Sequence, residues 1–238
     1  MLFDLDGVVT PTAEVHMRAW SEMFNAFLST FQGQGDLSPY TEVDYFAHVD
    51  GKPRYDGVRD FLSSRGISVP EGGPADPGSA DTVCGLGNRK NDAFNVVLER
   101  DGVVAYPGSV LLLDHLARLR LPLGVVSSSA NAPAVLEAAG LADRFATVVS
   151  GTVAHELDLP GKPAPDTFLH AAQELGARAD RTVVLEDAVS GVQAGAAGGF
   201  ALVVGVDRGA GHQTLRDAGA DVVVSDLAEL VPDEGRAG

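Results

Sequence analysis

Short apolar runs, each followed by a polar cluster, recur along the second half of the chain. These runs cover residues 122–126, 148–150, 182–185, 201–206 and 221–224. A run of this length bounded by turn residues is typical of a buried strand. Helix-like segments lie between the runs, including 132–139, which Gly140 ends, and a last short helix over 227–231. From Gly108 onward the alternation predicts a parallel sheet with helices on both faces, an α/β fold.

The first apolar run stands at the start of the chain, where Met1-Leu2-Phe3 leads into Asp4-Leu5-Asp6-Gly7-Val8. Side chains alternate along a strand, so Asp4 and Asp6 are expected to project from the same side. Beside Mg²⁺, one carboxylate can attack phosphorus while the other gives or takes a proton. The same residues also fit a strand end followed by a polar turn, and the rest of the chain has to decide between the two interpretations.

Residues 11–104 follow a different pattern. Large apolar side chains recur there at helical spacing, at Trp20, Met23, Phe24, Phe27 and Leu28, and no strand of comparable quality is visible. We therefore predict a Rossmann-like, doubly wound core formed by residues 1–11 and 105–238, with an inserted α-helical cap over 12–104. The Gly- and Pro-rich stretch 70–77 is expected to be a surface loop, and the tail 232–238 to be frayed.

Composition narrows the choice of partners. The 238 residues carry a formal net charge of −16, which argues against nucleic acid or an anionic membrane surface, because both are bound through basic patches. The single cysteine, Cys84, excludes an intrachain disulfide and is expected to be an ordinary buried thiol. With neither a signal-peptide pattern nor an apolar stretch of ~18 residues, we expect a soluble, cytoplasmic protein, and a monomer.

Further chemistry-bearing residues follow the later strands. They are Ser127, Lys162 in Gly-Lys-Pro-Ala-Pro-Asp, and the pair Glu186-Asp187. Each is expected at the carboxyl end of a strand, where open α/β sheets bind ligands. With Asp4 and Asp6 they provide a nucleophile, a hydroxyl for phosphate oxygens, a cation for developing charge and acidic ligands for Mg²⁺. The set predicts phosphoryl transfer.

These residues, in this order, resemble the four motifs of the haloacid dehalogenase superfamily, and the match covers nearly the whole chain. The more specific resemblance is to the β-phosphoglucomutase subfamily. It is carried by Thr12-Ala13-Glu14, His16, Arg18-Ala19-Trp20, Gly51, Arg54, the segment 88–92, the segment 126–131, and 162–166.

The resemblance implies roles for the core residues. Asp4 would become the aspartyl phosphate, and Asp6 would be the general acid and base, with its backbone carbonyl on the metal. Glu186 and Asp187 would complete a Mg²⁺ site with Asp4 and Asp6. Ser127 and Lys162 would bind the transferring phosphoryl group. Ser129 and Asn131 would hold the distal group of a sugar phosphate, with Ser128 beside them.

The resemblance also implies roles in the insert. Arg54 would bind the phosphate that is not transferred, which needs a bidentate donor. Gly51 belongs to the same substrate-binding set, and Lys90 and Asn91 would line a closed cleft. Thr12 and His16 would lie at the hinge and steer Asp6 into place.

Without that resemblance, three of these residues have simpler interpretations. His16 could be an ordinary helix residue whose hydrogen bonds are satisfied. Arg54 could be a solvated loop charge, and Lys90 could be a solvent-facing helix residue. Three positions also depart from the subfamily pattern, namely Pro11, Asp50 and Ala130. They put the identity of the substrate in doubt more than the reaction class.

Three functions remain open at this point. The first is interconversion of β-glucose 1-phosphate and glucose 6-phosphate through an aspartyl phosphate and a 1,6-bisphosphate. The second is a Mg²⁺-dependent phosphatase acting on sugar phosphates or related metabolites. The third is a non-catalytic binding module, against which stands the presence of every residue that the chemistry needs.

Overall fold

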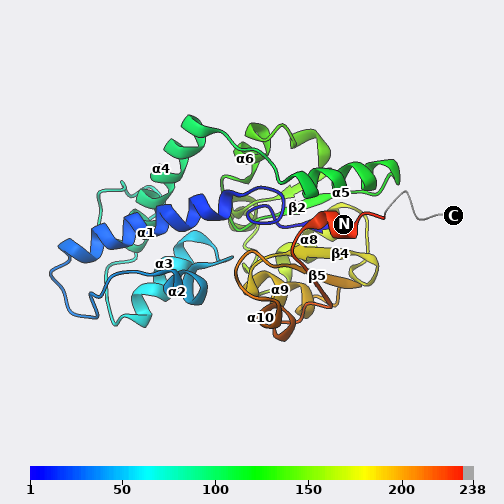
Figure 1. Cartoon of the computed structure of the whole chain (residues 1–238). Coiled ribbons are helices and arrows are strands. Elements are labelled where there is room, and N and C mark those ends of the chain that lie inside the picture. The colour runs from blue at the N-terminus through cyan, green and yellow to red at the C-terminus, as the bar shows by residue number, and fades with distance from the viewer. Residues whose placement is uncertain (233–238) are drawn as a thin grey trace. The chain divides into compact units, whose positions relative to one another are not determined.

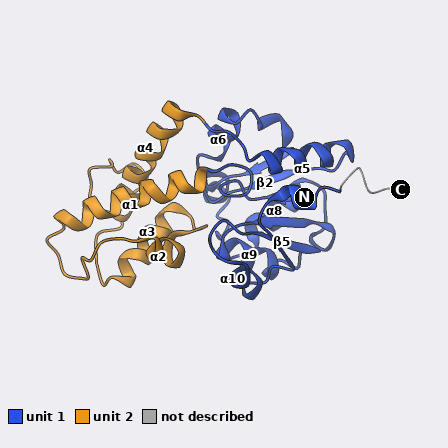
Figure 2. Ribbon diagram, in the orientation of Figure 1, with its two compact units in different colours: residues 1–11, 103–238 blue, residues 12–102 orange. Residues whose placement is uncertain are grey.

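The computed structural model describes residues 1–232 (Figure 1). It divides into two compact units, the first formed by residues 1–11 and 103–238 and the second by residues 12–102 (Figure 2). Residues 233–238, part of the tail expected to be frayed, lie outside the described residues. No helix of residues 1–232 combines the length and the apolar character needed to cross a membrane.

The first unit contains a six-stranded sheet in which all neighbouring strands pair in parallel. The strands are β1 (Leu2–Phe3), β2 (Gly124–Val126), β3 (Thr147–Val149), β4 (Val183–Glu186), β5 (Leu202–Val206) and β6 (Val222–Val224). Their order is β3-β2-β1-β4-β5-β6, so the chain order reverses between β1 and β4. Ligands of doubly wound sheets bind at such a reversal, outside the carboxyl ends of the strands.

The predicted α/β fold class is confirmed, with small shifts in the elements. Pro122 and Leu123 precede β2 rather than belonging to it. Ser150 lies beyond β3, because its hydroxyl accepts a hydrogen bond from the Val153 amide and begins a helix instead. The last short helix is a 3₁₀ helix over Leu227–Leu230, where Asp226 caps the first turn.

Helices pack on the sheet because strand side chains alternate between its faces. They are α5 (Pro107–Arg118), α6 (Ala132–Ala138), α7 (Gly151–Glu156), α8 (Asp166–Glu174), α9 (Val189–Ala197) and α10 (His212–Asp217), with short 3₁₀ helices at Ala142–Arg144 and Ala179–Arg181. On β1, Leu2 joins a buried cluster with Phe168 of α8, whereas Phe3 has its ring centroid 6.0 Å from that of Phe145. The central strand is thus covered on both faces.

The second unit consists of helices and loops throughout residues 12–102. Its elements are α1 (Thr12–Thr30), α2 (Glu42–Asp44), the π-helical turn Tyr45–Val49, α3 (Arg54–Ser64) and α4 (Val83–Asp101). The apolar residues at helical spacing on α1 are all buried, and Phe24 stands at the centre of an aromatic core. Its ring centroid lies 5.3 Å from that of Trp20, 4.2 Å from that of Phe61 and 4.9 Å from that of Tyr40. Cys84 is buried, as predicted.

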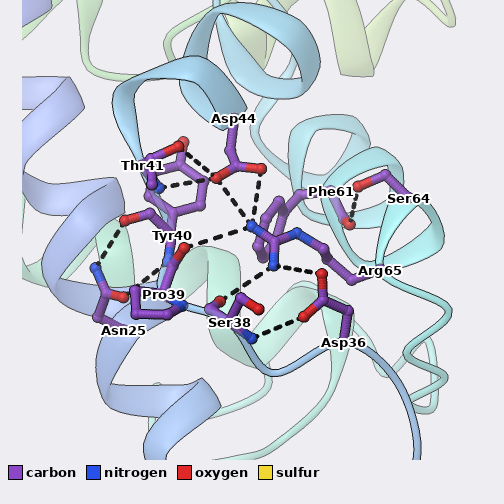
Figure 3. A network of polar contacts seen from close by, with 10 residues as sticks. All are labelled: Asn25, Asp36, Ser38, Pro39, Tyr40, Thr41, Asp44, Phe61, Ser64 and Arg65. Atoms are coloured by element: carbon purple, nitrogen blue, oxygen red, sulfur yellow. Dashed lines mark hydrogen bonds and ion pairs between the residues drawn. The ribbon is translucent and has the colours of Figure 1, made fainter.

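Arg65, just beyond the end of α3, ties the loop after α1 to that aromatic core (Figure 3). Its guanidinium donates to Asp36 and to the Ser38 carbonyl, each at 3.1 Å, and to both carboxylate oxygens of Asp44 at 2.9 Å. The guanidinium carbon lies 5.2 Å from the centroid of the Phe61 ring. One side chain therefore connects the loop after α1, helix α2 and the aromatic core.

Candidate active site

Asp4 and Asp6 leave the carboxyl end of the central strand. The Asp4 amide donates to the Leu185 carbonyl at 2.9 Å, which continues the pairing of β1 with β4 by one residue, and the Asp4 residue is 6% exposed. Gly7 then turns the chain at a φ of +88°, a value that favours glycine. A Cβ on Gly7 would lie 1.9 Å from an Asp187 oxygen. The turn therefore requires a residue without a side chain, both for its backbone and for its neighbour.

Lys162 is buried and bridges two carboxylates. Its ammonium lies 2.5 Å from Asp4 Oδ1 and 2.5 Å from Glu186 Oε1, and it donates to the Val126 carbonyl at 3.1 Å. The prediction that every site residue stands at a strand end is wrong for this lysine, which lies in the loop between α7 and α8. The short helix α7 stands between β3 and that loop, so the chain approaches the sheet edge a second time.

Glu186 is the last residue of β4, the neighbour of β1, and Asp187 follows it. One oxygen each from Asp4, Glu186 and Asp187 can be chosen so that all three lie within 4.8 Å of one another. Glu186 is fully buried, and its second oxygen accepts a hydrogen bond from the Ala188 amide at 3.0 Å. Carboxylate oxygens are the ligands that Mg²⁺ and similar hard cations prefer, so the donor set fits such an ion.

The electrostatics of the cluster are those of a site with excess negative charge. Burial raises the pKa of Asp4 well above its ordinary value, Lys162 opposes this rise, and Glu186 and Asp6 add to it. Burial would lower the pKa of Lys162, but the attraction of Asp4 and Glu186 outweighs it and raises that pKa. One lysine faces several carboxylates, so a further cation would stabilise their ionised forms.

Ser127 links the loop after β2 to the aspartate loop. Its hydroxyl donates to Asp6 Oδ2 at 3.2 Å and accepts from the Ser129 amide at 3.0 Å. The Ser129 hydroxyl accepts from the Asn131 amide at 3.1 Å. A Cβ on Gly151 would lie 2.5 Å from the Ser128 carbonyl, so α7 begins against this loop. Asp6, Ser127 and the segment to Asn131 thus form one connected group.

In the second unit, His16 and Lys90 meet beside aromatic rings. His16 of α1 stacks on Phe94 of α4 with centroids 4.0 Å apart, and its Nδ1 contacts the Lys90 ammonium. Lys90 is 3% exposed, and its ammonium lies 5.2 Å from the centroid of the Trp20 ring. The interpretation of Lys90 as a solvent-facing helix residue is therefore wrong. Thr12, at the start of α1, is buried.

Arg54 begins α3 and is held from one side. Its Nη2 donates to the Tyr55 hydroxyl at 3.1 Å and to Asn88 Oδ1 at 3.2 Å. The Arg54 Nε is buried and has no hydrogen-bond partner among residues 1–232. Asn88 in turn donates to the carbonyls of Pro74 and Asp76 at 3.0 and 2.8 Å. Arg54 is therefore partly buried and tethered rather than a freely solvated loop charge.

Two other predicted site residues lie near this group in sequence. Gly51 stands in the turn before α3 at a φ of +69°, and Asn91 follows Lys90 on α4 and is half-buried. The predicted residues thus fall into one set in each unit. The supporting roles of Tyr55 and Asn88 toward Arg54 were not predicted, because only the packing of α3 against α4 brings them together.

A carboxylate pair at the end of β1, a buried lysine and an acidic pair at the end of β4, all at the reversal of a doubly wound sheet, define a phosphoryl-transfer enzyme. Residues 1–199 match the family model described as haloacid dehalogenase-like hydrolase. The chain belongs to the haloacid dehalogenase superfamily, in its β-phosphoglucomutase-like branch, and is a phosphotransferase.

Both a mutase and a phosphatase are among the similar proteins. A β-phosphoglucomutase of Mycobacterium bovis is 51% identical over 237 residues, which cover 97% of this chain and 90% of the relative. Hexitol phosphatase A of Escherichia coli is 29% identical, with 96% of this chain and 91% of the relative covered. Among solved structures, a β-phosphoglucomutase from Clostridium difficile superposes with a TM-score of 0.76 at 23% identity, covering 97% of this chain and 92% of the other, which shows the fold.

Proposed function

We propose that this enzyme interconverts β-D-glucose 1-phosphate and D-glucose 6-phosphate through an aspartyl phosphate and a 1,6-bisphosphate. The observation that carries the proposal is the buried contact of Lys162 with Asp4, next to the acidic pair of β4, in a chain 51% identical to a β-phosphoglucomutase. The contact supports an ionised nucleophile in a dry site, and the similarity supports the choice of sugar phosphate.

Asp4 is the nucleophile in this proposal. One of its oxygens forms a bond to phosphorus while the bond from phosphorus to the sugar oxygen breaks. Lys162 offsets the negative charge of Asp4 and of the phosphoryl oxygens, and the Ser127 hydroxyl binds one of those oxygens. Asp6 donates a proton to the leaving oxygen, and in the return reaction it accepts the proton of the attacking hydroxyl.

Asp4, Glu186, Asp187 and the Asp6 carbonyl would hold Mg²⁺. The ion would neutralise charge on the phosphoryl group and keep the carboxylates ionised. Both oxygens of Glu186 already have protein partners, Lys162 and the Ala188 amide. We therefore assign to Glu186 a second task, which is to hold the lysine against Asp4.

The remaining residues of the proposed site bind the sugar phosphate. Arg54 would bind the phosphate that is not transferred, and its partnerless Nε supports this assignment, because a buried donor is stabilised by an anionic acceptor. The other residues assigned to the substrate are Gly51, Lys90, Asn91, Ser128, Ser129 and Asn131. Thr12 and His16 are assigned to steering Asp6.

The alternative is a sugar-phosphate phosphatase, in which water attacks the aspartyl phosphate. It is favoured by the phosphatase relative and by Ala130 and Asp50, which leave less positive charge for a second phosphate than the subfamily pattern provides. The two functions share Asp4, Asp6 and Lys162. They differ in whether a sugar phosphate or water removes the phosphoryl group.

One assay separates them. The protein is incubated with Mg²⁺, β-glucose 1-phosphate and a trace of the 1,6-bisphosphate, and glucose 6-phosphate and free phosphate are measured in the same sample. A mutase forms glucose 6-phosphate with little free phosphate, whereas phosphate release without glucose 6-phosphate would reject the proposal. Asp4→Asn serves as the control, because it removes the nucleophile and should abolish turnover while the protein stays folded. Turnover retained in this variant would show that Asp4 is misassigned.

A further inference from the structure

Arg208 lies two residues beyond β5 and contacts three separate segments of the first unit. Its Nε donates to the Gly7 carbonyl at 2.9 Å, and its Nη1 donates to the Ser225 carbonyl at 3.0 Å. The guanidinium carbon lies 4.0 Å from the centroid of the Tyr106 ring. β1, β5 and β6 all end at the same edge of the parallel sheet, so this arginine stands at the edge that carries Asp4 and Asp6.

The contact with Gly7 matters because this residue follows Asp6. Glycine has more backbone freedom than any other residue, so its conformation has to be fixed from outside. The Gly7 amide donates to the Thr10 carbonyl at 2.8 Å, and the Gly7 carbonyl accepts from Arg208. Both backbone groups of Gly7 are thus engaged, which restrains the turn that begins at Asp6.

Neighbouring residues fix the position of the Arg208 guanidinium. The preceding residue, Asp207, accepts the amides of Gly209 and Gly211 through one carboxylate oxygen, each at 3.0 Å, which shapes the loop around the arginine. Tyr106, on which the guanidinium stacks, donates its amide to the Val9 carbonyl at 3.0 Å. A planar guanidinium can donate to two carbonyls and stack on a ring at once, which the single ammonium of a lysine cannot reproduce.

We propose that Arg208 is a positioning residue for Asp6. It locks Gly7 and thereby holds the Asp6 carboxylate where it can transfer a proton to or from the substrate oxygen. The inference rests on the role of Asp6 in the proposed function. Arg208 acts through Gly7 rather than by contact with the substrate, so its effect should fall on proton transfer and not on formation of the aspartyl phosphate as such.

The test compares two phosphoryl donors. Hexose phosphates leave as alkoxides and need a proton, whereas acetyl phosphate releases acetate, a weak base that needs none. Arg208→Met should lower kcat on the hexose phosphate by about tenfold or more, with KM nearly unchanged, while phosphorylation of Asp4 by acetyl phosphate stays within about twofold of the wild type. The kcat of Arg208→Lys on the hexose phosphate should lie between those of the wild type and Arg208→Met. Arg216→Met, an arginine of α10 on the same unit, is the matched control and should behave as the wild type.

A second readout does not depend on activity. Deuterium uptake by the amides of residues 5–10 should be at least about tenfold faster in Arg208→Met than in Arg216→Met, because the lock on Gly7 is lost. Unchanged uptake in this segment would overturn the inference, and so would equal slowing of the reactions with both donors. If the wild type turns over no hexose phosphate, the proposed function fails, and the uptake experiment still decides whether Arg208 orders the segment that carries Asp6.

Discussion

At the scale of single residues, the site depends on one buried lysine that offsets the negative charge of two carboxylates. Lys162 contacts Asp4 and Glu186 within a buried environment. Without it, burial and the repulsion of Glu186 and Asp6 would favour protonation of Asp4, and a protonated Asp4 is a poor nucleophile. The same environment lets a modest shift in geometry have a large effect, because charges interact more strongly where water is excluded.

Gly7→Ala tests how tightly the aspartate loop is packed. The new Cβ would lie 1.9 Å from an Asp187 oxygen at a φ of +88°, so Asp187 or the turn has to move. We expect a loss of about 2 kcal/mol in the free energy of unfolding and a higher Mg²⁺ requirement for activity. Urea unfolding and Mg²⁺ titration of the rate would measure the two effects.

Gly140→Ala is the matched control for that variant. Gly140 has a φ of +66° with nothing within 4 Å of an added Cβ, so the substitution carries only the backbone cost. It should destabilise the protein without changing the Mg²⁺ requirement. If both variants required the same Mg²⁺ concentration for activity, the packing of Gly7 against Asp187 would not matter for the Mg²⁺ requirement.

At the scale of elements, α4 organises the second unit. Lys90 on this helix contacts His16 of α1, and Asn88 connects Arg54 of α3 to the loop at Pro74 and Asp76. The spacing of apolar residues predicted helices here, but it did not predict which polar residues would be buried. That depended on the way the helices pack against one another.

Asn88→Ala should loosen Arg54. The guanidinium loses an acceptor and the loop loses two donors, so we expect KM for the hexose phosphate to rise about fivefold, the equivalent of ~1 kcal/mol for one hydrogen bond. The rate of Asp4 phosphorylation by acetyl phosphate should be unchanged. Asn95→Ala, on the same helix, is the control and should leave both values as in the wild type. A KM equal to that of the control would show that Arg54 is held without Asn88.

At the scale of the whole molecule, each unit has a core of its own. The first is built on a sheet whose central strand packs Leu2 into a buried cluster with Phe168 and Phe3 against the Phe145 ring, and the second on an aromatic cluster around Phe24. The polar network of Arg65 adds to the second core, because it fixes a loop between α1 and α2 (Figure 3). This network makes the stability of the second unit depend on pH.

The sign of that dependence follows from Asp44. Partial burial acts to raise its pKa, but hydrogen bonds from Thr41 and Arg65 outweigh burial and lower it. A carboxylate with a lowered pKa stabilises the folded state above its unfolded pKa, near 4, and this contribution is lost as the pH falls through the folded value. We expect urea unfolding followed by circular dichroism to show lower stability at pH 3 than at pH 6.

Arg65→Met should reduce the part of this pH dependence that comes from Asp44. The variant should also be less stable than the wild type at pH 6, since an apolar side chain cannot replace the lost hydrogen bonds. Arg18→Met, an exposed position on α1, is the control and should keep the wild-type pH dependence. An unchanged difference between pH 3 and pH 6 in Arg65→Met would place the titrating group elsewhere.

The sequence by itself determined the fold class and most of the strands, because both follow from local patterns. Alternation of apolar runs with helical segments needs only neighbouring residues. The motif residues Asp4, Asp6, Ser127, Glu186 and Asp187 could be named for the same reason, since each lies at or within a few residues of the carboxyl end of a strand. The strand ends at Phe3, however, so the expectation that Asp4 and Asp6 project from one side of a strand does not follow from the structure.

Only the tertiary structure decided which distant side chains touch. Lys162 reaches Asp4 from a loop between two helices, and Arg208 reaches the carbonyl of Gly7, which lies 201 positions away in the chain. Lys90 is buried because aromatic rings from α1 and α4 close around it. Such contacts depend on how whole elements pack, and no local spacing of residues encodes them.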